Sequence, residues 1–366
     1  MLGRFSRESF VLWGVFLISL SMQLWLWLGK FPYTDNNIWV PGAQDFANGV
    51  LPGYYTTIPP HPGTAILLPA AAIIHLGVTA YDAVQIAMAF LMSVCIVCIT
   101  YLSRILRPQS LWWLGVCALL ILNPIYLEMS AVSALAALLA CIYILLILHI
   151  REKGASDESL ALLGVCAGIL LATRTDTGAS LMLFSLPFLW PLAGTRLVRT
   201  CTMALLYFGA LNPFIWADPI MYVLSFLKQI SANALTSYVF DYSLWIITGA
   251  VIAFILGLIG TYFKPRLFSI PTDYMKWFLA TSTIICGLLL VSEYHPTRYF
   301  FPFITMWEMF LPLFLLELLS YFGSWKILQP LRRSEYALVL LLLFSRVWVV
   351  YAMWLHKFGP LFHIVV

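Results

Sequence analysis

The stretch AYDAVQIAMAFLMSVCIVCITYLS, residues 80–103, carries a single carboxylate and no basic residue. As a helix it is long enough to cross the ~30 Å hydrocarbon core of a bilayer. Similar apolar runs recur along the whole chain, in which 62% of the 366 residues are hydrophobic and only 10% are charged. A soluble domain with a wet surface does not sustain such a composition. The sequence therefore predicts an all-α polytopic membrane protein.

The apolar runs predict about eleven transmembrane helices, and residues 1–366 form a single transmembrane domain. The predicted spans are 10–29, 80–103, 111–127, 131–150, 159–173, 177–193, 201–216, 243–263, 275–292, 300–322 and 336–356. The segment 63–76 is apolar but short and flanked by proline, so the outer interface suits it better than a crossing. An odd number of spans puts the C-terminus outside.

The distribution of charge predicts the orientation. With a cytoplasmic N-terminus, most Lys and Arg residues fall in the inner loops, as the positive-inside rule requires. Acidic residues show the reverse preference, so a basic residue that remains outside needs a reason. The sequence has no Asn-x-Ser/Thr triplet and its loops are short, which favours a bacterial inner (plasma) membrane.

We interpret the cysteines and two of the glycines inside the predicted spans as packing residues. All seven cysteines lie in apolar stretches, where cysteine behaves as a small hydrophobe. Cys95 and Cys98 form a CxxC pair without polar ligands nearby, which does not favour a metal or redox site. Gly164 and Gly168 form a GxxxG pattern, which predicts a close helix contact inside the fold.

The segment FPYTDNNIWVPGAQDFANGVLPGYYTTIPPHPGT, residues 31–64, is the long polar break near the start of this apolar chain. It carries Asp35, Asp45 and His61, and insertion or packing does not require such residues. We therefore interpret it as an outer catalytic loop that contains short juxtamembrane helices. Polar groups recur at other outer span ends, and their convergence would form an outward-facing cavity. These groups lie at 122–128, 173–176, 212–219 and 293–302.

The order of these motifs resembles the integral-membrane GT-C glycosyltransferases, especially the protein mannosyltransferase and aminoarabinose transferase group. The loop motif with its Pro-Pro-His-Pro run carries the resemblance, together with NP at 123–124, ATRTD at 172–176 and HPTRYFFP at 295–302. The chain is similar to a short form without the soluble C-terminal domain of the larger members. This leads us to expect a lipid-linked glycan, a polysaccharide or another surface molecule as the acceptor.

The resemblance implies an inverting transfer of a monosaccharide from a polyprenyl-phosphate donor at the extracytoplasmic face, in cell-envelope glycan biosynthesis. Asp35 takes the position of the general base that deprotonates the acceptor hydroxyl. A departing phosphate needs a cation, for which Arg298 is the first candidate and Arg174 the second. Further substrate-binding candidates are Asp45, His61, Asp176, Lys228, His295 and Tyr299. We expect membrane lipids around the protein and no nucleic-acid partner.

Each candidate also has a structural interpretation. Asp35 suits the N-cap of the helix that follows it, and Arg298 suits a snorkelling interface residue. Asp176 offers Arg174 an ion pair. Asp45 suits a solvated position, and His61 an ordinary loop histidine.

Two other classes of function stay open: a transporter or flippase of lipid-linked sugars, and a non-enzymatic membrane assembly protein. The polar motifs concentrate on the outer side, whereas a transport path needs them on both sides of the membrane. A divalent cation also stays open as a cofactor, because the outer acidic residues form no ligand set with a persuasive spacing.

Overall fold

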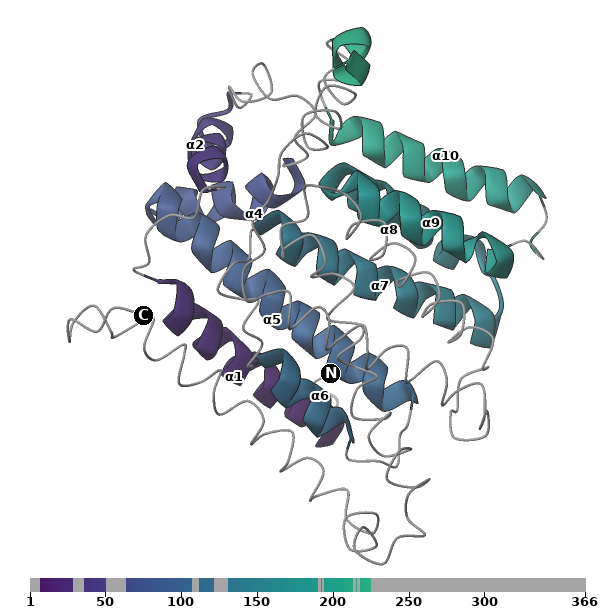
Figure 1. Ribbon diagram of the computed structural model, residues 1–366, viewed down its shortest axis with the longest axis horizontal. Coiled ribbons are helices and arrows are strands. Elements are labelled where there is room, and N and C mark those ends of the chain that lie inside the picture. Colours follow the sequence, from purple (N-terminus) through teal and green to yellow (C-terminus); the bar gives the residue numbers. More distant parts are fainter. Residues whose placement is uncertain are drawn as a thin grey trace, which may run out of the picture.

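A computed structural model describes residues 7–28, 36–50, 64–106, 112–121, 131–189, 192, 194–212, 215 and 218–224 of the chain. Within these residues the structure is helical and contains no strand (Figure 1). The helices are α1 (Arg7–Trp27), α2 (Asn36–Ala47), α4 (Thr64–His75), α5 (Ala80–Leu106), α6 (Trp112–Ile121), α7 (Ala131–Lys153), α8 (Asp157–Thr173), α9 (Thr175–Leu189) and α10 (Gly194–Ala210).

Two of these helices, α5 and α7, are long and apolar enough to cross a membrane. In α5 the apolar stretch runs from Ala80 to Ile105, and in α7 from Leu135 to Lys153. The predicted spans 10–29, 159–173 and 177–193 also coincide with helices, namely α1, α8 and α9. That these helices cross a bilayer stays a prediction. The spans predicted after residue 224 lie outside the described residues.

One boundary differs clearly from the prediction. Span 201–216 was expected where α10 instead begins at Gly194 and ends at Ala210. The apolar run starts after Arg196 and Arg199. The helix includes both arginines, and their side chains, 49% and 66% exposed, reach water from its first turns. Hydrophobicity therefore marked the apolar part of this helix and missed its charged first turns.

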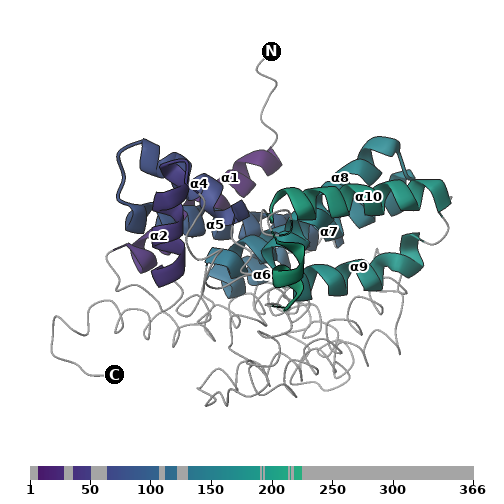
Figure 2. The ribbon, with the colours of Figure 1, turned by 90° about the horizontal axis from the view of Figure 1, so that it is seen from above.

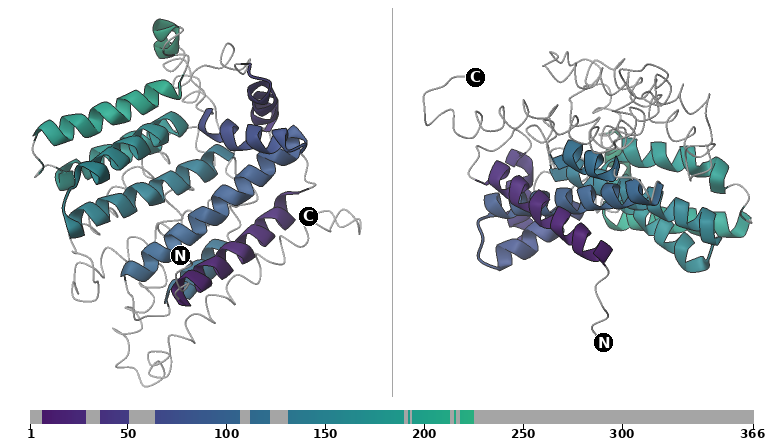
Figure 3. Two further views of the ribbon diagram at one scale, coloured as in Figure 1. Left: turned by 180° about the vertical axis from the view of Figure 1, so that it is seen from behind. Right: turned by 90° about the horizontal axis from the view of Figure 1, so that it is seen from below.

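The long helices lie side by side in a row that runs from α1 through α5, α7 and α8 to α10 (Figures 1 and 3). Helix α9 overlaps α8 in Figure 1 and is separated from it in depth in Figure 2, so it covers a different side of α8 from α10. The core lies between these helices, and Met92, Ile96 and Ile99 of α5 are almost completely buried in it. Burial of apolar side chains from successive turns explains why α5 lies inside the row, between α1 and α7.

The helices of the row have their ends on two opposite sides of the bundle. These two sides differ, and we call them the two ends of the row and name each by one residue. The Arg174 end holds α2, α4, the starts of α5 and α7, and the junction of α8 with α9. The Asp157 end holds the last turns of α5 and α7 and the first turns of α8 and α10 (Figure 1). Of the short helices expected in the first loop, 31–64, the structure describes α2, whereas α4 covers the apolar segment 63–76 that follows the loop. The two helices pack on each other and on α5 at the Arg174 end.

Gly164 and Gly168 of α8 face α10, as the GxxxG pattern predicted. A Cβ atom built at Gly164 would lie 2.6 Å from the carbonyl oxygen of Thr200. At Gly168 it would collide with the carbonyl oxygen of Ala204. Only glycine permits this approach of the two backbones, so the prediction of a close contact inside the fold is confirmed.

Candidate functional site

Arg174 alone connects α8 to α9, because α8 ends at Thr173 and α9 begins at Thr175. Its backbone is extended, with φ −147° and ψ 101°. The Arg174 N–H donates to the Leu170 carbonyl at 2.8 Å, and the Arg174 carbonyl accepts from the Gly178 N–H at 2.9 Å. One residue thus closes α8 and opens α9. The residue is only 8% exposed, so the Arg174 guanidinium is largely enclosed by protein.

Gly178 explains how the chain can turn within one residue. A Cβ atom at this position would lie 2.8 Å from the backbone nitrogen of Leu171. The first turn of α9 therefore rests directly on the last turn of α8. Thr175 reinforces the junction, since its hydroxyl donates to the Leu171 carbonyl at 3.1 Å. The sequence analysis missed Gly178, although a glycine four residues after the candidate arginine was a visible signal.

Helix α2 begins at Asn36, the residue directly after Asp35, and carries Asp45 in its last turn. Trp39 and Ala43 are buried one turn apart and fix one face of α2 inward. The Asp45 carbonyl accepts from Val50 N–H at 2.9 Å and helps to end the helix. The Asp45 side chain is half-buried. The helix expected around AQDFANG is therefore present.

The structure brings the regions of two predicted site residues to the same end of the molecule. Helix α2, which carries Asp45, packs on α4, and α4 packs on α8, which leads into Arg174. Asp176 follows in the first turn of α9. The other predicted site residues lie outside the described residues: Asp35, His61, Lys228, His295, Arg298 and Tyr299.

Thr177, also in the first turn of α9, was not singled out from the sequence. Its side chain is fully buried, and its hydroxyl has no hydrogen-bond partner within the described part of the chain. A buried hydroxyl without a partner costs free energy relative to a methyl group. The sequence signal was weak, because threonine within a mainly apolar helix is common and usually bonds to its own backbone.

The polar groups that follow α10 have local structural roles. The amide of Asn212 is buried and donates to the Phe208 carbonyl at 2.7 Å, which closes the helix. An Asp218 carboxylate oxygen accepts from the Met221 N–H at 2.9 Å and caps the helical segment 219–224. Burial raises the pKa of the neighbouring Tyr222 phenol. Contacts with the backbone therefore explain why Asn212 and Asp218 occur at these positions, and no ligand is needed to explain them.

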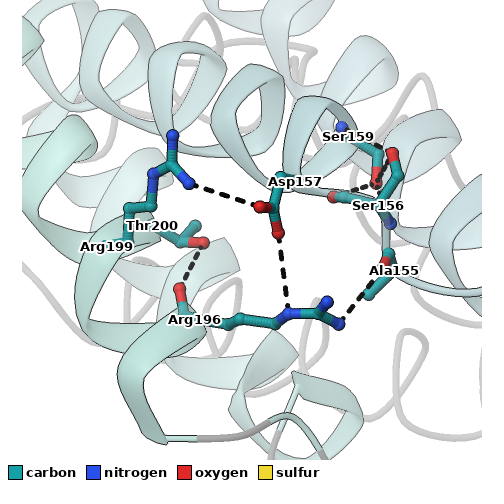
Figure 4. A network of polar contacts seen from close by, with 7 residues as sticks. All are labelled: Ala155, Ser156, Asp157, Ser159, Arg196, Arg199 and Thr200. Carbon is teal, nitrogen blue, oxygen red and sulfur yellow. Dashed lines mark hydrogen bonds and ion pairs between the residues drawn. The ribbon is translucent and has the colours of Figure 1, made fainter.

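Figure 4 shows the polar network at the Asp157 end. The Asp157 carboxylate pairs with the Arg196 Nε at 3.6 Å and with an Arg199 guanidinium nitrogen at 3.5 Å. Arg196 also donates to the Ala155 carbonyl at 3.3 Å. Ser156 caps the start of α8 next to this network. All three charged side chains are about half exposed or more, so water screens these pairs strongly.

The described cysteines pack as the sequence analysis expected. Cys95 of α5 and Cys141 of α7 are buried with their sulfur atoms 3.9 Å apart, and Cys166 donates to the Leu139 carbonyl at 3.4 Å. The cysteines in the described residues are free thiols. No group of three or more His, Cys, Asp or Glu side chains that could hold a metal occurs among the described residues. Dependence on a divalent cation thus stays untested.

No protein-family model matches the chain, and no curated protein matches its sequence. The order of the sequence motifs and the geometry of the Arg174 end therefore bear on the function.

Proposed function

We propose that the protein is an inverting membrane glycosyltransferase that transfers a monosaccharide from a polyprenyl-phosphate donor to an acceptor on the extracytoplasmic face. The observation that carries the proposal is the burial of Arg174 between α8 and α9, at the same end of the bundle as α2 and α4. A guanidinium that is shielded from water attracts an anion more strongly than one on an exposed surface. The donor of such a reaction supplies a phosphate, to which a planar guanidinium donates bidentate hydrogen bonds.

The proposed reaction is a single displacement at the anomeric carbon of the sugar. The acceptor oxygen forms a bond to this carbon while the bond from the carbon to the phosphate oxygen breaks. The Asp35 carboxylate takes the acceptor proton, and the polyprenyl phosphate leaves with the electron pair of the broken bond. Attack opposite the leaving group inverts the anomeric configuration. Arg298 and Arg174 would stabilise the charge that develops on the phosphate.

The remaining candidates would hold the sugar and the acceptor. Carboxylates such as Asp45 and Asp176 accept hydrogen bonds from sugar hydroxyls, whereas His61, Lys228, His295 and Tyr299 can donate to sugar or phosphate oxygens. The two ends of the helix row are consistent with the orientation that we propose. Exposed Arg196 and Arg199 suit a cytoplasmic face, and the Arg174 end would then face the outside of a bacterial inner membrane.

The test is a transfer assay with purified full-length protein in detergent. A panel of polyprenyl-phosphate sugars is offered with membrane lipid extract as the source of acceptors, and products are identified by mass spectrometry. We expect one donor to yield a product that is heavier by one sugar residue. Asp35→Asn should abolish this product but preserve donor binding, because the amide keeps the size of the side chain and loses the base. Failure of every donor with the wild-type protein would contradict the proposed function.

A further inference from the structure

We propose that the first turn of α9 is an oxyanion site that takes a phosphate ester carried on an apolar chain. This α9 anion site consists of the Arg174 guanidinium, the first-turn backbone amides of residues 175–177 and the Thr177 hydroxyl. The inference rests on the proposed function and adds to it a specific hydrogen-bond donor, Thr177. It also names the helix terminus that receives the phosphate.

The start of α9 has the properties of an anion-binding helix terminus. The first N–H groups of any helix lack acceptors within the helix, and the helix dipole places partial positive charge there. Here the preceding residue is Arg174, which is 8% exposed. The 15 residues of α9 supply the aligned dipoles. Fixed donors and a guanidinium in a place shielded from water attract a phosphate more strongly than the same groups on a surface.

Thr177 is the second, independent observation. Threonines in helices usually donate to the carbonyl four residues earlier. Thr173 does so to Ile169 at 2.7 Å, and Thr175 does so to Leu171 at 3.1 Å. The Thr177 hydroxyl, by contrast, has no hydrogen-bond partner within the described residues and is fully buried. Because Cα–Cβ bonds in a helix tilt toward its N-terminus, this side chain leans back toward Arg174. A phosphate oxygen at the helix start would provide the missing acceptor.

Asp176 is also in the first turn of α9, and a carboxylate in this turn of a helix would oppose the binding of an anion. This carboxylate therefore allows a test of whether the bound group is negatively charged. Removing its charge while keeping its size, in Asp176→Asn, should tighten phosphate binding if the anion is bound at this turn. A role of the turn in binding only neutral sugar hydroxyls predicts no such gain.

The experiment measures binding by isothermal titration calorimetry with full-length protein in detergent. The probes are farnesyl phosphate, farnesol and inorganic phosphate. We expect farnesyl phosphate to bind more tightly than farnesol, and Thr177→Val to raise its Kd about ten-fold or more, as for loss of a hydrogen bond to a charged group. Thr177→Ser should restore binding. Binding of inorganic phosphate with the same dependence on Thr177 would also support the site and identify free phosphate as a ligand.

Thr173→Val is the matched control, because it makes the same substitution four residues earlier, at the last residue of α8, where the hydroxyl has a backbone partner. We expect this variant to lower the Tm and leave the Kd unchanged. Thr177→Val should leave the Tm unchanged or raise it, since the lost hydroxyl had no partner. The site is overturned if Thr177→Val lowers the Tm without changing the Kd, or if farnesol binds as tightly as farnesyl phosphate. Binding that depends on Thr177 without any sugar transfer would uphold the site and contradict the proposed function.

Discussion

The two ends of the helix row use arginine in opposite ways. At the Asp157 end, Arg196 and Arg199 share one carboxylate, and Arg199 is 66% exposed. At the Arg174 end, one arginine is 92% shielded, since only 8% of it is exposed, and it occupies the single position between two helices. Water solvates Arg196 and Arg199 with or without their partner Asp157, whereas Arg174 depends on protein or ligand groups. The same residue type is therefore solvated at one end and enclosed by protein at the other.

The contrast is tested most strongly by removing one arginine from each end. We expect Arg174→Ala to lower kcat/KM for sugar transfer by about ten- to hundred-fold, as for loss of hydrogen bonds to a charged phosphate. Arg199→Ala should leave kcat/KM within about two-fold, because an exposed arginine in a weak pair contributes little. Steady-state kinetics on the purified variants provides the measurement.

Arg174→Lys separates the charge from the planar geometry. A lysine keeps the positive charge but cannot form bidentate hydrogen bonds to a phosphate, so we expect an intermediate loss of activity. Equal activity of wild type, Arg174→Ala and Arg174→Lys would show that burial of this arginine has only a structural meaning. The difference between the two ends would then concern packing alone.

A second test places one methyl group at each end. Gly178→Ala brings a Cβ atom to 2.8 Å from the Leu171 nitrogen, whereas Gly194, at the start of α10, has no heavy atom within 4 Å of its built Cβ. We expect Gly178→Ala to reduce the free energy of unfolding by about 1–3 kcal/mol, because backbone must shift. Gly194→Ala should stay within about 0.5 kcal/mol. SDS titration of the folded protein in mixed micelles measures both, and equal values would contradict the tight α8–α9 junction.

The sequence predicted the elements that depend on apolar periodicity and failed where a single residue decides the geometry. The run 80–103 agrees with α5, and Gly164 and Gly168 correctly indicated a close helix contact. The start of α10 was missed because its arginines interrupt the apolar run without interrupting the helix.

The same limit applies to the candidate site: the sequence pattern indicated where polar residues gather but not how they are arranged. The TRTD motif marked a polar span end, but composition does not reveal that Arg174 stands alone between two helices. The missing partner of the Thr177 hydroxyl depends on distances between elements that the sequence does not contain. Asp35 and Arg298 lie outside the described residues, so their roles stay predictions.

A third test lies between the two ends, where α7 and α9 are joined by a buried contact of the Tyr143 and Ser185 hydroxyls at 2.5 Å. We expect Tyr143→Phe to lower the free energy of unfolding by about 1 kcal/mol, as for one neutral hydrogen bond. Activity should be preserved, because its partner Ser185 lies about 15 Å along α9 from the first turn of that helix. The Ser185 hydroxyl keeps its bond to the Met182 carbonyl, which limits the loss. A larger effect on transfer than on stability would mean that the site extends into the middle of the bundle.

The smallest effect is expected at the Asp157 end itself. Asp157→Asn removes the carboxylate that both Arg196 and Arg199 contact, yet we expect a loss below about 1 kcal/mol, because all three side chains are well exposed. The loss should shrink further in 0.5 M salt, since added ions weaken the attraction between exposed charges. SDS titration at low and high salt measures both values. A loss of several kcal/mol that is insensitive to salt would mean that this end is shielded from water, and the contrast with the Arg174 end would no longer hold.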